Sequence, residues 1–151
     1  MSLLYTVLVV IHVFSAIIGL GPGFSFIFIK RSAKSLPELK QAYQLTRLLH
    51  RFVMVGGFLL LATGLAMGAI QPRLFHMGWY CASLALFILA LAMGPLVLTP
   101  RTKRIRQLLT EAEGDRIPEA YERLAKEQRR YEWLLNTFFL VIIFLMITKP
   151  F

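Results

Sequence analysis

The stretch IHVFSAIIGLGPG, residues 11–23, decides the fold class, because it lies inside an apolar run that carries no Asp, Glu or Lys. That run, Leu3–Ile29, is longer than the about 20 residues that cross the hydrocarbon core of a bilayer. A helix turns about 100° per residue, so the residues that share the face of His12 can be counted. Ala16, Gly19 and Gly23 lie within about 40° of the direction of His12, so the face below it is lined by small residues. Such a face can receive a neighbouring helix at close range, or a planar ligand.

The composition places the whole chain in the membrane class. Hydrophobic residues make up 57% of the 151 residues, and Arg51 is the one charged residue inside four apolar segments. These segments are Leu3–Ile29, Leu48–Ile70, Met77–Leu98 and Trp133–Thr148. We therefore predict an all-α fold, a four-helix transmembrane bundle in which residues 1–151 form one domain.

The basic residues are concentrated in two loops. Of the 17 Lys and Arg residues, six lie within Lys30–Arg51 and nine within Arg101–Tyr131. The positive-inside rule places both loops in the cytoplasm and both termini outside, in what we expect to be the bacterial cytoplasmic membrane. A net charge of +9 that is confined to membrane-flanking loops predicts contact with anionic lipid headgroups and no nucleic-acid partner. Lys30 and Arg31 follow the first apolar run, which is the layout of a retained helix and not of a signal peptide.

Both basic loops carry helix signals. In the first, Ser35-Leu36-Pro37-Glu38 is typical of a helix start and predicts a short amphipathic helix on the membrane surface. The second, a cytoplasmic arm over residues 101–131, has apolar residues at helical spacing before a turn at Gly114-Asp115. Pro118 can open a final helix that runs to residue 148, about 45 Å long. We expect the two halves of the arm to pair as an antiparallel hairpin.

Stripes of small residues predict where helices approach each other. Gly64 and Gly68 form a small-xxx-small pattern on one face of the second segment. Prolines at 22, 95 and 100 predict bends in the first and third segments. Cys81, the single cysteine, is expected to be a small buried residue. The predicted helix-packing residues are Gly19, Gly23, Gly57, Gly64, Gly68 and Gly94.

Two histidines in the outer half form the candidate site. His12 and His76 each head a stripe of small residues, and two imidazoles on different helices could ligate a b-type haem. Met67 is an alternative axial ligand, and Arg73 could pair with a propionate. Beyond such a haem iron no metal site is predicted. The alternative is that each histidine hydrogen-bonds a neighbouring helix. His50 is interpreted as an interfacial residue that meets water or a phosphate.

The opening pattern, Tyr5 through an apolar run to His12 and then Ser15-Ala16 and Gly19, resembles the first helix of an uncharacterised family of small bacterial membrane proteins. These are predicted integral membrane proteins with four helices. More distantly the chain resembles the J-type protoporphyrinogen oxidases and copper-resistance D-type membrane domains. The J-type resemblance implies a first-helix histidine that acts with a membrane lysine. His12 corresponds to that histidine, but no lysine lies inside the four segments.

Three functions follow as hypotheses. The first is a non-catalytic membrane module or subunit with a histidine-lined outer cleft for b-type haem. The second is a purely structural homo-oligomer or complex subunit without a cofactor. The third is a small-molecule channel or carrier. No catalytic residue is assigned, and oxidase-like activity is disfavoured because the membrane lysine of that family is absent.

Overall fold

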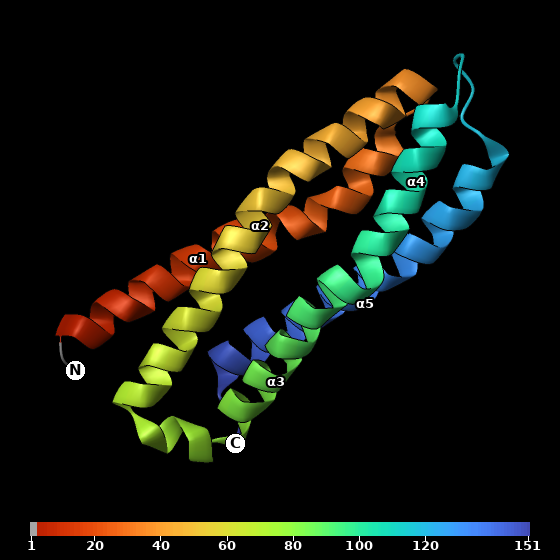
Figure 1. Ribbon diagram of the computed structural model, residues 1–151. Helices are drawn as coiled ribbons and strands as arrows, with labels where there is room; N and C mark the ends of the chain where they lie inside the picture. The colour runs from red at the N-terminus through yellow and green to blue at the C-terminus, as the bar shows by residue number, and fades with distance from the viewer. Residues whose placement is uncertain (1–2) are drawn as a thin grey trace.

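The computed structural model describes residues 3–151 and confirms the predicted all-α class (Figure 1). Four helical stretches are long and apolar enough to cross a membrane, and the part of the chain described contains no β-strand. The elements are α1 (Leu3–Ser32), α2 (Leu36–Ile70), the 3₁₀ turn η1 (Pro72–His76), α3 (Gly78–Met93), the π-helical segment η2 (Gly94–Leu98), α4 (Thr99–Glu111) and α5 (Glu119–Thr148).

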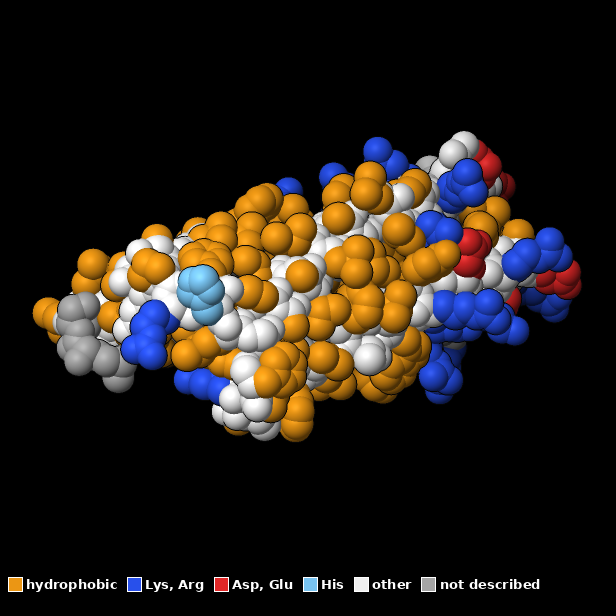
Figure 2. Space-filling view, turned by 90° about the horizontal axis from the view of Figure 1, so that it is seen from below, with side chains coloured by type: hydrophobic (Ala, Val, Ile, Leu, Met, Phe, Trp, Pro, Cys, Tyr) orange, Lys and Arg blue, Asp and Glu red, His pale blue; other side chains and the backbone are white. Residues whose placement is uncertain are grey.

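The helices are arranged as two long antiparallel hairpins (Figure 1). α1 lies along α2, and the continuous α3–η2–α4 helix lies along α5. Both chain ends lie at one end of the molecule, and the α1–α2 and α4–α5 connections lie at the other. Lysine, arginine and acidic side chains gather at the end with these connections, whereas most of the remaining surface in the same view is hydrophobic (Figure 2). This asymmetry is what the positive-inside pattern predicts for the cytoplasmic end.

Three hydrophobic clusters hold the elements together. In the middle, each spanning helix contributes one fully packed side chain: Leu20, Leu60, Phe87 and Ile142. At the charged end a second cluster joins α2, α4 and α5 through Leu36, Leu39, Tyr43, Ile105, Leu109, Tyr121 and Ala125. At the opposite end Leu74, Trp79 and Tyr80 cover the η1 turn. The charged end is therefore a compact three-helix extension of the membrane bundle.

The first basic loop differs from its prediction. The prediction of a separate surface helix was wrong, because α2 is one helix of 35 residues that begins at Leu36. Ser35 is the N-cap, and its hydroxyl accepts a hydrogen bond from the Glu38 amide at 3.4 Å. No glycine lies between Pro37 and Gly56, and no further proline, so nothing ends the helix before it reaches the membrane.

The second basic loop follows its prediction closely. The chain turns around Gly114, whose φ is +84°, and α5 begins directly after Pro118. The expected α4–α5 hairpin forms, and α2 completes it as a third helix. The predicted bend near Pro95 takes the form of the π-helical segment, which accommodates a residue without an N–H donor. The helix then continues into the charged end without a break.

Cys81 is not the buried residue that was expected. It is exposed on α3, and its thiol lies 3.1 Å from the carbonyl oxygen of Phe75. The positions that α3 buries nearby are Tyr80 and Ser83. The small size of cysteine predicted burial, but the helix phase directs this side chain outward, toward the lipid.

The tightest helix contact is a backbone crossing between α1 and α2. A Cβ atom built on Gly56 would lie 2.5 Å from the Gly19 Cα, and one built on Gly19 would lie 2.8 Å from the Gly56 carbonyl carbon. Both distances are too short for any side chain other than hydrogen. Glycine at both positions therefore permits the two helices to cross in direct backbone contact.

Gly56→Ala tests this crossing against Gly21→Ala, a matched change at a helical site with nothing within 4 Å of the added Cβ. We expect Gly56→Ala to lower the free energy of unfolding by about 1–3 kcal/mol, because the helices must move apart. Gly21→Ala should leave it unchanged or raise it slightly. Thermal unfolding in detergent measures both. Equal stability of the two variants would contradict a contact crossing.

Candidate functional site

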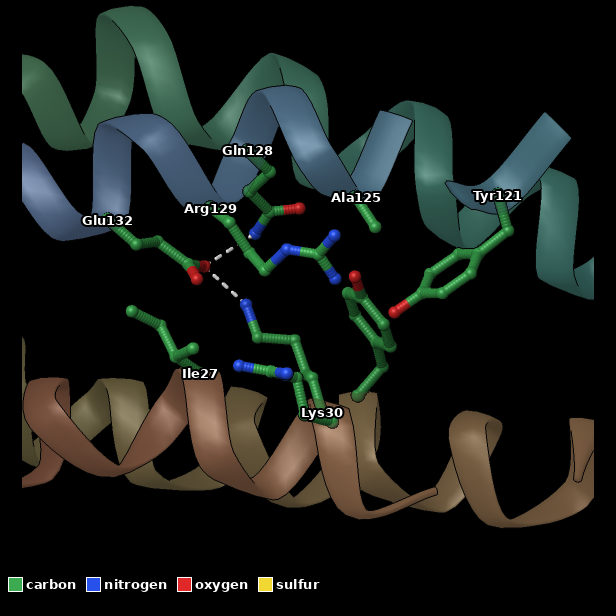
Figure 3. Close-up of a pocket in the computed structure, with 9 residues that line it drawn as sticks. Ile27, Lys30, Tyr121, Ala125, Gln128, Arg129 and Glu132 are labelled. Carbon is green, nitrogen blue, oxygen red and sulfur yellow. Dashed lines mark hydrogen bonds and ion pairs between the residues drawn. The ribbon is translucent and has the colours of Figure 1, made fainter. Parts of the chain in front are cut away.

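A buried ion pair joins α1 to α5 where the membrane segments end. Lys30 is in the last turn of α1, and Glu132 directly precedes the apolar part of α5. Their side chains form a salt bridge and keep only 10% and 9% of their exposure. Figure 3 shows the two side chains pointing toward each other from facing helices. A charge pair this far from water is costly unless further hydrogen bonds satisfy it.

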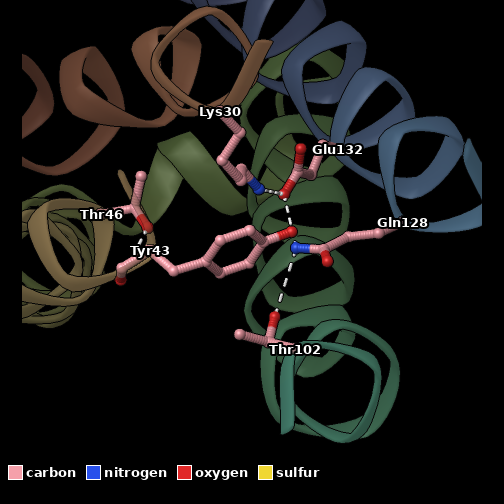
Figure 4. Close-up of polar contacts among 6 residues, drawn as sticks. All are labelled: Lys30, Tyr43, Thr46, Thr102, Gln128 and Glu132. Carbon is pink, nitrogen blue, oxygen red and sulfur yellow. Dashed lines mark hydrogen bonds and ion pairs between the residues drawn. The ribbon is translucent and has the colours of Figure 1, made fainter. Parts of the chain in front are cut away.

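Gln128 supplies such a hydrogen bond and extends the pair to α4. Its side-chain amide donates to Glu132 Oε1 at 2.8 Å and to the Thr102 hydroxyl at 3.2 Å (Figure 4). Glu132 Oε1 therefore accepts from both Lys30 and Gln128. Within residues 3–151, the other carboxylate oxygen, Glu132 Oε2, and Gln128 Oε1 are buried without a hydrogen-bond partner.

Two tyrosines lie beside this pair, toward the charged end of the molecule. The Lys30 ammonium lies 5.5 Å from the centroid of the Tyr43 ring, within the range of a cation–π contact. Tyr43 in turn meets the Tyr121 ring edge-on at 6.3 Å. The network thus contacts α1, α2, α4 and α5. We call Lys30, Tyr43, Thr102, Gln128 and Glu132 the inner polar network.

A small cavity lies inside the inner polar network. Its volume is about 10 Å³, and its lining includes Ile27, Tyr121 and Ala125 as well as the polar side chains (Figure 3). That volume holds one water molecule at most. Two buried acceptor oxygens without a donor are suited to one water molecule, and a haem or an organic substrate is far too large. The arrangement can fasten helices and hold a proton or a water, and it has no room for a larger ligand.

The sequence reasoning missed the inner polar network. Lys30 was interpreted only as the positive flank of an apolar run, and Glu132 was assigned no role. One signal was available: Gln128 and Glu132 stand four residues apart, on the same helical face as Ala125 and Leu135. A polar pair on an otherwise apolar face indicates a buried polar contact.

In the half of the bundle that holds the chain ends, His12 contacts the neighbouring helix. Its Nδ1 lies 2.8 Å from the Thr63 hydroxyl, which also lies 2.7 Å from the Leu59 carbonyl and 3.2 Å from the Leu60 carbonyl. The single hydroxyl proton thus has three acceptors within reach, and both neutral tautomers of His12 fit this geometry. In the tautomer with the proton on Nδ1, the Nε2 lone pair can ligate a metal.

The other residues of the candidate haem site lie in different surroundings. His76 and Arg73 are exposed in the η1 turn, whereas Met67 is partly buried and packs against the outer cluster of Leu74, Trp79 and Tyr80. The structure thus places Met67, Arg73 and His76 around one end of the bundle. It gives His12 a protein partner on α2 instead of a contact with His76. His50 is exposed and lies 6.5 Å from the Phe26 ring.

The predicted glycines lie against protein atoms with one exception. An added Cβ would approach Asn136 at Gly23, Leu91 at Gly57, the His12 ring at Gly64, and Phe75 and Tyr80 at Gly68. At Gly94 it would meet nothing within 4 Å. Gly19 meets Gly56, a residue that the predicted set of packing glycines did not include. The small-residue stripes are therefore largely filled by the chain itself.

Removing one member of the buried pair tests how much the inner polar network contributes to stability. We expect Lys30→Met to lower the free energy of unfolding by about 3–5 kcal/mol, because it leaves the Glu132 charge buried and unpaired. The double change Lys30→Met with Glu132→Met should recover most of that loss. Denaturant unfolding in detergent measures the free energy of unfolding of the single and the double variant.

The matched control is the exposed pair of Arg101 and Glu127, which are 2.8 Å apart with Glu127 52% exposed. Glu127→Gln should cost less than about 1 kcal/mol. If Lys30→Met cost no more than Glu127→Gln, the buried pair would not be a structural fastener.

Comparison with known proteins places the chain in a family. Residues 6–150 match the profile of the predicted integral membrane proteins described as DUF2269. No curated protein and no solved structure matches the chain. The match agrees with the resemblance drawn from the first helix, and it lends no support to the more distant resemblances. Because it covers nearly the whole chain, the protein belongs to the DUF2269 family of predicted integral membrane proteins.

Proposed function

We propose that this protein is a non-catalytic membrane module, either a homo-oligomer or a subunit of a larger membrane complex. Its bundle centre is packed with its own side chains, and the small cavity at the inner end holds about one water molecule. Such an interior supports a role in assembly more than one in catalysis or transport. The protein would then act through its surfaces.

The observation that carries this proposal is the uncovered outer half of α1. In the apolar window of α1 17% of residues are buried, against 33% in α2 and 22% in each of the other two spanning helices. The residues that α1 buries lie on one side of the helix, and the opposite side carries a ridge of large apolar side chains. Between residues 10 and 18 the exposed members of that ridge are Val10, Val13, Phe14, Ile17 and Ile18.

The α1 ridge has the shape that another helix can receive. Phe14, Ile17 and Ile18 stand at i, i+3 and i+4, the spacing of a ridge that packs into the groove of a neighbouring helix. A second copy would pair with it about a two-fold axis, as in most homo-oligomers. A different subunit would use the same ridge.

Cysteine cross-linking tests the α1 ridge in native membranes. Replacing the single cysteine by Cys81→Ser gives a background in which one new thiol reports its own contacts. We expect Phe14→Cys or Ile17→Cys to give cross-linked species on mild oxidation or with a short bifunctional reagent. Twice the chain mass indicates a homo-oligomer, and another mass indicates a complex subunit.

The control is Ile88→Cys on α3, which is similarly exposed at 52% and should stay uncross-linked. Absence of cross-links at residues 14, 17 and 18, together with single-chain particles in nanodiscs, would contradict the proposal.

A second candidate function is b-type haem binding in the outer half, favoured by His12, whose Nδ1 contacts the Thr63 hydroxyl and whose Nε2 is the nitrogen that could ligate an iron. His12 would supply one axial ligand and Met67 or His76 the other, with Arg73 near a propionate. The donor chemistry fits a haem iron. There is little room for the haem ring itself, because Phe75 and Tyr80 lie against Gly68 and would have to move.

An absorption spectrum of the purified protein, oxidised and then reduced with dithionite, tests this candidate. Haem binding predicts a Soret band with sharp reduced α and β bands that His12→Ala abolishes, because the iron loses its ligand. Thr63→Val, which removes only the hydrogen bond to Nδ1, should weaken the band without abolishing it. A spectrum without a Soret band from cells supplied with haem would eliminate the candidate.

A further inference from the structure

Three basic side chains, those of Arg47, His50 and Arg106, lie along the line where α2 and α4 meet, which we call the seam. Next to the seam, Tyr43 of α2 packs with Ile105 of α4 in the hydrophobic cluster of the three-helix extension. One and two turns further along the same face of α2 come Arg47 and His50, and Arg106 follows Ile105 on α4. Because Tyr43 and Ile105 pack in one buried cluster, Arg47 and Arg106 flank the same contact between α2 and α4. The charge of Arg106 acts on both Arg47 and His50, in agreement with this placement.

The directions of the two helices make these side chains converge. Side chains on an α-helix lean toward its N-terminus. α2 runs from the cytoplasmic end into the membrane, so Arg47 and His50 lean toward the cytoplasm. α4 runs the opposite way, and Arg106 leans toward the membrane. All three therefore reach the same level at the membrane boundary.

The seam has positive charge without a balancing carboxylate. Lys30 also lies within the electrostatic reach of Arg106, but Glu132 neutralises it. In the described part of the chain the ion pairs are Lys30–Glu132, Arg101–Glu127 and Arg129–Glu122. None of these includes Arg47 or Arg106, and Arg106 is itself partly buried. Partly desolvated like charges repel each other, and an anion between them would remove that repulsion.

The depth of the seam indicates the source of the anion. Arg47 directly precedes the apolar segment that begins at Leu48. Further into the membrane, α2 exposes Met54 and Phe58 within about 20° of the direction of Arg47, with 39% and 61% of each residue exposed. A molecule with an anionic phosphate at the seam and an acyl chain along this surface satisfies both regions. A free phosphate satisfies only the first.

We propose that Arg47, His50 and Arg106 form a binding site for the phosphate of an anionic phospholipid. The two guanidinium groups hold the phosphate oxygens by paired charge-assisted hydrogen bonds, and the His50 ring adds a third polar contact. The lipid thereby joins α2 to α4 beside the inner polar network. This site is independent of whether the α1 ridge pairs with another helix.

Native mass spectrometry of the full chain, delipidated in detergent, tests the site. The probes are phosphatidylglycerol, phosphatidylcholine and inorganic phosphate. We expect one phosphatidylglycerol to bind first and most tightly, and Arg47→Gln or Arg106→Gln to weaken it at least about tenfold, because each removes a charge-assisted contact. Arg106→Lys should also weaken binding, since it keeps the charge but loses the paired geometry.

The matched control is Arg104→Gln, which removes an exposed arginine from the same helix about 200° away from Arg106. It should leave binding of the first lipid unchanged. Equal weakening by Arg104→Gln, equal binding of phosphatidylcholine, or equally tight binding of inorganic phosphate would each overturn the proposal. If Arg106→Gln fails to fold, Arg47→Gln at an exposed position gives the same test.

Discussion

The buried salt bridge between Lys30 and Glu132 is the constraint on which the charged end of the molecule depends. It fixes the last turn of α1 against α5, and Gln128 links it to α4 through Thr102. A charge pair in low dielectric tolerates little misplacement, because an unpaired charge there costs several kcal/mol. The three hydrophobic clusters pack the helices together along the bundle, whereas this pair fixes the position of the α1–α2 hairpin relative to α5.

The fold could be predicted from the sequence because membrane insertion imposes a strong pattern. Four apolar runs, two basic loops, and Pro118 after Gly114 were enough to give the helices and the arm hairpin. The prediction was wrong for the first basic loop, where a change in composition was interpreted as the boundary between two helices. Polar residues before Leu48 suggested a surface helix, but helix propensity continues from Leu36 into the membrane without a break.

The candidate site could be predicted only in part, because side-chain partners depend on helix phase. His12 was expected to contact either a ligand or a helix, and Thr63 is its helix partner. Gly56 and the Lys30–Glu132 pair join residues far apart in the chain, so no local spacing predicts them. The direction in which each side chain leaves its helix also brings Arg106 toward Arg47 and leaves the α1 ridge uncovered. The functions proposed for the protein therefore depend on contacts at its surface.

We infer that the inner polar network holds the α1–α2 hairpin against the hairpin formed by α3, α4 and α5. Pulsed electron paramagnetic resonance tests it directly, with spin labels at the exposed residues Gln41 on α2 and Lys126 on α5 in the Cys81→Ser background, in nanodiscs. We expect one narrow distribution of distances between the two labels. It should broaden in Lys30→Met and narrow again when Glu132→Met is added. A distribution that Lys30→Met leaves unchanged would contradict it.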